Sequence, residues 1–136
     1  MDDLSKSSAI ASAGMKAQSK RIRVTSENLA NANSLSNMPG GEPYRRKLVT
    51  FRNLVDQELD AVKPVVRRMT EDMSPFGRKY DPGHPAADEN GYIMTPNVNP
   101  LVELMDLREA ERSYEANMNV IQVSKQLTSK TVDLLR

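Results

Sequence analysis

The 136-residue sequence has no cysteine and no tryptophan, and its only histidine is His84. Without cysteine, the chain can form neither a disulfide nor a thiolate metal site, and one histidine cannot supply the usual set of zinc ligands. We therefore expect no metal and no cofactor.

Motifs for catalysis are also missing. The sequence contains no GxSxG nucleophile motif, no GxxxxGK[ST] phosphate loop and no GxGxxG dinucleotide motif. His84 lies between Gly83 and Pro85, which are residues typical of a turn. These features predict a non-enzymatic protein with His84 in a structural role. The alternative is an enzyme centred on His84, such as a wall hydrolase.

Neither sign of charge dominates, because 19 Lys and Arg residues face 18 Asp and Glu residues, for a net charge of +1. Nothing therefore favours nucleic acid or an anionic membrane as a partner. No apolar run approaches the roughly 20 residues that span a bilayer. The first residues, MDDLSKSSAIASAG, begin acidic and lack a continuous apolar core. We expect neither a transmembrane segment nor a cleavable signal peptide.

Large apolar side chains are scarce. Hydrophobic residues make up 38% of the sequence, with two Phe and four Tyr. A compact domain usually contains more large apolar residues than this. We therefore expect an extended subunit that completes its burial against copies of itself or against partners.

An amphipathic helix is expected from Leu4 to about Asn33. Apolar residues recur in alternate steps of four and three, which is typical of one helix face. Small residues such as Ala13 and Gly14 lie beside this seam and permit another helix to approach closely. The residues expected to pack against a partner helix are Leu4, Ala11, Met15, Ile22 and Leu29.

A second, longer helix is expected from Pro100 to the end of the sequence, where no further Gly or Pro occurs. Asn99 is placed to cap this helix, and Pro100 suits its first position. Asn117 lies near the seam, where a polar residue commonly sets the register of paired helices. The seam residues of this helix are Leu104, Leu107, Tyr114, Asn117, Met118, Ile121, Val132 and Leu135.

The segment between the helices holds all eight prolines when Pro100 is included. Arg46–Leu54 and Lys63–Met69 have strand-like patterns, but Asn53–Val62 could instead be a short helix. Residues 74–85 are expected to be irregular. The predicted fold is mainly α, with long terminal helices that pair as a coiled coil and a small irregular β-containing insert. The predicted domains are 1–34, 35–99 and 100–136, with the two terminal helices together forming one inner domain.

Two stretches resemble one known family. ENLANAN followed by PYRRK resembles the N-terminal motif of bacterial flagellar rod and hook proteins. DPGHPAADENGYIMTPNVNP followed by LVELMDLREAERSYEANMNVIQVSKQL is similar to the C-terminal signature of proximal rod proteins in that family. The broader pattern passes quickly from the Ala-Asn run to a Thr-Gly-Tyr-Arg turn, whereas here SLSNMPGGE intervenes before Pro43 and Tyr44. The motif residues are Asn28, Leu29, Ala30, Asn31, Pro43, Tyr44, Arg45, Arg46, Gly91, Tyr92, Pro96, Asn97, Asn99, Glu115, Ala116 and Asn117.

The resemblance implies a structural subunit of the rod that crosses the periplasm in the flagellar basal body. It implies export through the flagellar type III system without a cleaved signal peptide. The implied partners are other rod proteins, further copies of the chain in a helical assembly, and the export gate and MS ring at the base of the flagellum. The alternative is a coiled-coil adaptor or chaperone of a type III export system.

Overall fold

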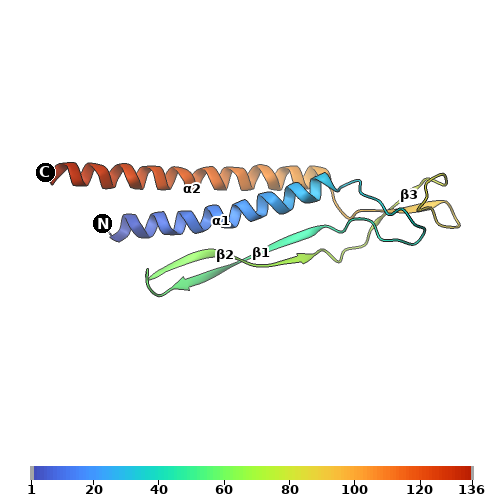
Figure 1. The fold of residues 1–136 in the computed structure, drawn as a ribbon, viewed down its shortest axis with the longest axis horizontal. Coiled ribbons are helices and arrows are strands. Elements are labelled where there is room, and N and C mark those ends of the chain that lie inside the picture. Colours follow the sequence, from blue (N-terminus) through green and yellow to red (C-terminus); the bar gives the residue numbers. More distant parts are fainter. Residues whose placement is uncertain (1, 136) are drawn as a thin grey trace. The chain divides into compact units, whose positions relative to one another are not determined.

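The computed structural model describes residues 2–135, which form a long helix near each end of the sequence and a small β-containing region between them in sequence (Figure 1). The prediction of terminal helices around a β insert is confirmed. The elements are α1 (Asp2–Ala30), β1 (Lys47–Asp56), β2 (Ala61–Glu71), β3 (Gly77–Tyr80), β4 (Tyr92–Thr95) and α2 (Pro100–Leu134).

The described chain divides into two compact units, and each draws on both helices. Unit 1 contains residues 2–22, 49–68 and 108–135, and unit 2 contains residues 23–48 and 69–107. Each unit therefore brings together segments that are far apart in the sequence.

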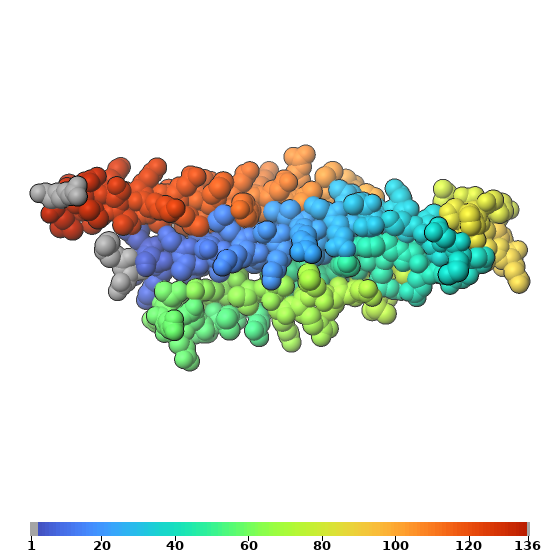
Figure 2. Space-filling model, in the orientation of Figure 1, coloured from blue at the N-terminus to red at the C-terminus, as the bar shows by residue number. Residues whose placement is uncertain are grey.

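In unit 1, α1 lies between α2 on one side and the β1–β2 hairpin on the other (Figure 1). Its buried positions are small, including Ala11 and Ala17 on α1 and Ala110 on α2. Small side chains allow close packing but bury little apolar area, so the core of this unit is thin. In the space-filling view, α1 stays uncovered on the face between α2 and the hairpin (Figure 2).

The β1–β2 hairpin resolves the choice between strand and helix. The strand prediction for Arg46–Leu54 is confirmed, and the helix alternative for Asn53–Val62 is wrong. The Asp56 side chain accepts hydrogen bonds from the backbone N–H groups of Glu58 and Leu59, which holds a turn in place of a helix. The second predicted strand is also confirmed and extends further, over Ala61–Glu71.

In unit 2, β3 and β4 form an antiparallel pair that aligns Gly77 with Thr95 and Tyr80 with Tyr92. The prediction that residues 74–85 are irregular is wrong for Gly77–Tyr80. The four-residue strand β3 exists because β4 lies beside it, and the paired Tyr rings meet edge to face at 5.2 Å. Local pattern gives little signal for such a short strand.

Candidate functional site

The site of interest is a hydrogen-bond network in unit 2, centred on Asn28 in the last turns of α1. The Asn28 side chain is 1% exposed. Its Oδ1 accepts from the backbone N–H of Lys47 at 2.9 Å, while its Nδ2 donates to the Lys47 carbonyl at 2.9 Å. The amide thus pairs with the start of β1 as a neighbouring strand would. Only a side chain with both a donor and an acceptor can do this.

The remaining capacity of the Asn28 amide is also used. Its Oδ1 accepts from the Tyr44 hydroxyl at 2.9 Å, and its Nδ2 donates to Glu103 Oε2 at 3.1 Å. Two donors and two acceptor positions are therefore all satisfied at a buried site. This amide joins α1, the segment before β1 and the first turn of α2.

Glu103 is a buried carboxylate, 1% exposed, and it needs a charged partner. Arg46 supplies it, since its Nε donates to Glu103 Oε1 at 2.5 Å. The same guanidinium lies 3.4 Å from Asp72 Oδ2 and 3.7 Å from Asp106 Oδ2. Burial opposes the charged form, but the hydrogen bonds to Glu103 and Asp72 raise the pKa of Arg46 above its ordinary value. Arg46 therefore holds three carboxylates around one cation.

Asn97, just before α2, extends the network. Its Oδ1 accepts from the backbone N–H of Arg46 at 2.8 Å, and its Nδ2 donates to the Asp72 carbonyl at 2.9 Å and to the Ser74 carbonyl at 3.2 Å. The Ser74 backbone N–H donates to Asp72 Oδ1 at 2.9 Å. The hydrogen bonds from Ser74, followed by the Arg46 charge, lower the pKa of Asp72.

The edge of the network carries two further shifted groups. Burial, followed by the negative charge of Glu27, raises the pKa of Tyr44. The Lys47 ammonium donates to Glu27 Oε1, and this hydrogen bond raises the pKa of Lys47. Both pKa shifts therefore follow from burial and from contacts within the network.

Two further asparagines of the family motif cap helix ends, Asn31 at the end of α1 and Asn99 at the start of α2. Asn31 Nδ2 donates to the Glu27 carbonyl at 2.9 Å, and its Oδ1 accepts from the Ser34 hydroxyl at 3.0 Å, which caps the end of α1. Asn99 Oδ1 accepts from the backbone N–H of Leu101 at 3.1 Å, so the predicted cap of α2 is confirmed.

Of the other motif residues, Arg45 adjoins the network, since its Nη1 donates to the Asp72 carbonyl at 3.1 Å and to the Ser74 carbonyl at 3.4 Å. The Arg45 guanidinium lies 4.1 Å from the centroid of the Phe76 ring. Gly91 adopts a φ of 80°, a conformation that favours glycine. Buried motif residues are Pro43, Gly91 and Pro96; Leu29 is half-buried; and exposed ones are Ala30, Tyr92, Glu115 and Ala116.

His84 belongs to a turn next to β3. Its Nδ1 accepts from the Ala86 backbone N–H at 3.0 Å, and its own backbone N–H donates to the Asp81 carbonyl at 3.1 Å. The ring nitrogen is thus used to hold the turn. Across residues 2–135, no group of three or more potential metal-ligating side chains is found.

In unit 1, α1 and α2 come into close contact at Gly14. A Cβ placed on Gly14 would lie 2.8 Å from Nδ2 of Asn117, so only glycine leaves room for that amide. The Asn117 amide also donates to the Ser113 carbonyl at 2.9 Å. Arg21 lies 3.9 Å from Glu109, so the two helices run antiparallel.

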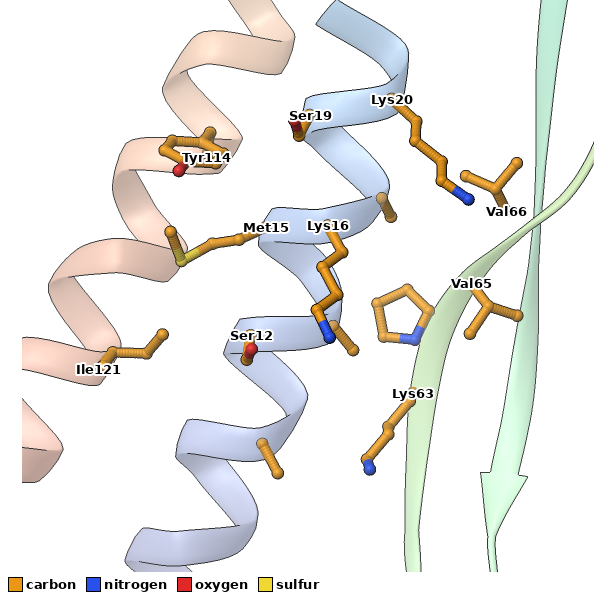
Figure 3. A pocket seen from close by; sticks show the side chains of 14 residues that line it. Ser12, Met15, Lys16, Ser19, Lys20, Lys63, Val65, Val66, Tyr114 and Ile121 are labelled. Carbon is orange, nitrogen blue, oxygen red and sulfur yellow. The ribbon is translucent and has the colours of Figure 1, made fainter.

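The predicted seam residues have different surroundings. Met15 of α1 and Tyr114 and Ile121 of α2 line one groove (Figure 3). Ala11 is buried; Leu4, Met15, Ile22, Leu29, Leu107, Tyr114, Asn117 and Ile121 are half-buried; and Leu104, Met118, Val132 and Leu135 are exposed.

The end of α2 is exposed because it passes the first turn of α1. Counting twelve residues back from Gly14 reaches Asp2, and twelve forward from Asn117 reaches Ser129. Val132 and Leu135 therefore have no described residue of α1 opposite them.

Several residues of the network carried no signal in the sequence. Glu103 and Asp72 look like ordinary surface acids, and Lys47 like the last residue of a basic cluster. Their roles depend on Arg46, which is 57 residues from Glu103. The one usable signal was the run of asparagines in ENLANAN, because asparagine is unfavourable inside a helix unless its amide has another use.

No helix within residues 2–135 is both long enough and apolar enough to span a bilayer.

Comparison with known proteins first defines the class. Residues 89–134 match the family model described as the flagellar basal body rod FlgEFG protein C-terminal. This region covers β4, the Asn97 and Asn99 segment and all of α2.

Three relatives, each named flagellar basal-body rod protein FlgC, are similar along nearly the whole chain. The protein of Agrobacterium fabrum is 48% identical over 136 residues, covering 100% of this chain and 98% of that protein. The protein of Salmonella typhimurium is 42% identical over 129 residues and 92% of each chain. The protein of Borreliella burgdorferi is 37% identical over 144 residues, covering 93% of this chain and 94% of that protein.

The chain belongs to the FlgC family of flagellar basal-body rod proteins. It is a structural subunit of the flagellar basal-body rod, as the motif resemblance predicted. The alternative of an adaptor or chaperone for type III export is not favoured by these matches.

Proposed function

We propose that this subunit polymerises helically through its two terminal helices, which pair as a coiled-coil inner layer, and that the packed helices transmit torque. The observation that carries this proposal is the apolar surface of α2 in unit 1. Val120, Val123 and Leu127 are exposed, and they recur in steps of three and four along the helix. Such a stripe is typical of a helix face that packs against another chain.

The proposed inner and outer domains correspond to the helical and β-containing segments of the sequence. Residues 1–34 and 100–136 form one inner rod domain, and residues 35–99 form an outer insert. The seam residues that remain exposed, Leu104, Met118, Val132 and Leu135, then complete their burial in the assembly. The network around Asn28 supports this role, since it ties the end of one helix to the start of the other.

The family membership supports the proposed setting. The subunit assembles with other rod proteins and further copies of itself, and it meets the export gate and MS ring at the base. It reaches the periplasm through the flagellar type III system without cleavage of a signal peptide. Its role is mechanical and involves no catalysis and no cofactor.

The test is Val123→Asp in a strain that lacks the native subunit. Because Val123 is 52% exposed, this change leaves the free subunit able to fold and introduces a charge into the proposed interface. We expect the variant protein to be exported but absent from purified basal bodies, with loss of swimming.

Gln122→Asp is the matched control, because it adds the same charge at the neighbouring, exposed position on another face of α2. It should leave swimming intact. Normal swimming and normal incorporation of Val123→Asp would show that this face is not an assembly surface.

A further inference from the structure

Unit 1 contains a groove of about 920 Å³ that runs along α1 between α2 and the hairpin (Figure 3). Its floor is made of small α1 side chains, including Ala9 and Ala13. Tyr114 and Ile121 of α2 line one side, and the Pro64–Val66 segment of β2 lines the other. A floor of small residues allows the backbone of a packed helix to approach closely.

The groove is basic. Lys16, Lys20 and Lys63 line it, and no acidic residue does. Lys63 is paired, since its Nζ lies 2.7 Å from Asp56 Oδ2. Lys16 and Lys20 form no ion pair with any residue between positions 2 and 135. They are four residues apart on one helix, so their side chains lie on the same face, about 6 Å apart at their Cβ atoms.

The same unit presents a matching acidic face on α2. Glu111 and Glu115 are exposed, are also four residues apart, and form no ion pair within the described part of the chain. Met118 follows on this face and is 38% exposed. The two carboxylates therefore have the same four-residue spacing as the two lysines. Met118 lies beside the carboxylates, as the apolar floor lies beside the lysines.

We propose that the groove binds the Glu111, Glu115 and Met118 face of α2 from a second copy of this chain. The carboxylates of one copy meet Lys16 and Lys20 of the next, and Met118 packs on the alanine floor. The occupant is a second copy because the complementary face is present on this same chain, where it is left unpaired. This inference rests on the proposed helical assembly and names one contact within it.

The groove and the acidic face are different surfaces, and each copy has one of each. Association through two different surfaces can continue from copy to copy, which is how a helical polymer grows. The contact includes exposed charges, so we expect it to weaken as the salt concentration rises.

A charge exchange between full-length chains tests the pairing. Lys16→Glu with Lys20→Glu makes the groove acidic, and Glu111→Lys with Glu115→Lys makes the α2 face basic. Each variant alone should self-associate about tenfold or more weakly than the wild type in sedimentation velocity, because like charges then oppose one another. An equimolar mixture should regain association, because each groove then finds a face of opposite charge.

Lys79→Glu with Lys130→Glu is the matched control, since it makes the same change in net charge at exposed lysines outside both surfaces. It should associate like the wild type. The pairing is wrong if the mixture stays dissociated, if the control is weakened equally, or if the wild type remains monomeric at high concentration.

A cross-link identifies the occupant. The chain has no cysteine, so single cysteines can be introduced without competing thiols. Copies with Ala13→Cys mixed with copies with Met118→Cys should form a disulfide-linked dimer, whereas Ala13→Cys mixed with Asn119→Cys should not.

In cells, an Ala13→Cys cross-link to a different rod protein, in place of a second copy, would overturn the inference. The proposed function would then stand, provided that the subunit is still found in basal bodies. Absence of the wild-type subunit from basal bodies would instead remove the proposed function.

Discussion

Asn28→Asp is the sharpest perturbation of the unit 2 network, because it changes chemistry with almost no change of shape. The substitution replaces Nδ2, which donates to the Lys47 carbonyl and to Glu103 Oε2, by a carboxylate oxygen. The Lys47 carbonyl and Glu103 Oε2, which are both acceptors, then face a carboxylate oxygen that is also an acceptor. The new carboxylate also lies beside Glu103, which is 1% exposed. The backbone bond from Lys47 and the hydroxyl bond from Tyr44 remain possible.

The expected cost is a large part of the stability of the subunit. Each buried acceptor that loses its donor costs about 1–3 kcal/mol, so two cost about 2–6 kcal/mol. The remaining hydrogen bonds to the new carboxylate become charge-assisted and return about 1 kcal/mol. We therefore expect a net loss of about 3 kcal/mol at neutral pH, against a typical total of about 5–15 kcal/mol.

The penalty should depend on pH. Burial and the Glu103 charge would raise the pKa of an aspartic acid at position 28 above its ordinary value of about 4. The folded state then binds a proton more tightly than the unfolded state. The loss of stability is therefore smallest below about pH 4, where the protonated carboxyl can still donate one hydrogen bond, and it grows as the pH rises through the raised pKa.

Urea unfolding followed by circular dichroism at several pH values measures this loss. For a slope of about 1–3 kcal/mol/M, the midpoint at neutral pH should fall by roughly 1–3 M. Asn119→Asp is the control, because Asn119 is exposed on α2 and should change stability by less than about 0.5 kcal/mol. The reasoning is refuted if Asn28→Asp is as stable as Asn119→Asp at neutral pH, or if its penalty is the same at every pH.

Two further predictions concern the helix contact and the acid response. Gly14→Ala should destabilise the subunit by about 1 kcal/mol, because overlap with Asn117 outweighs the gain of about 1 kcal/mol in helix propensity. In an Asn117→Ala background, Gly14→Ala should instead stabilise the subunit. Thermal unfolding of the wild type, the two single variants and the double variant measures both effects. Stabilisation by Gly14→Ala in the wild-type background as well would contradict this reasoning. Asp72 has a lowered pKa, so its contribution is present above about pH 4 and is lost as the pH falls through its folded pKa. Asp72→Asn should therefore lower the free energy of unfolding by about 1 kcal/mol at pH 7 and leave it unchanged in strong acid. Denaturant titrations at the two pH values measure this difference, and equal losses at both would exclude this role.

Local patterns predicted the elements that depend on local chemistry. The apolar periodicity of the terminal segments predicted both helices, and Asn99 with Pro100 predicted where α2 begins. The alternation in Arg46–Leu54 predicted β1. The helix alternative at Asn53–Val62 was wrong because the Asp56 side chain stabilises a turn, which periodicity does not detect.

Contacts between distant segments were outside the reach of such patterns. The strand β3 depends on β4, whose first residue lies twelve positions after Tyr80. Glu103 meets Asn28 across 75 residues of sequence, and nothing around Glu103 distinguishes it from an exposed acid. Sequence-based reasoning paired the seams of the two helices only with each other, whereas the groove along α1 requires a third segment, β2, to form its other wall.

The sequence by itself determined the two terminal helices, the point where α2 starts, and the rod family to which the chain belongs. These follow from periodicity, capping and motifs, which are properties of neighbouring residues. Only the tertiary structure decided that Asn28, Arg46, Asn97 and Glu103 form one network, because buried polar groups must find partners wherever the chain brings them. It also decided which faces of α2 remain uncovered, since burial depends on what packs against a helix and not on the helix alone.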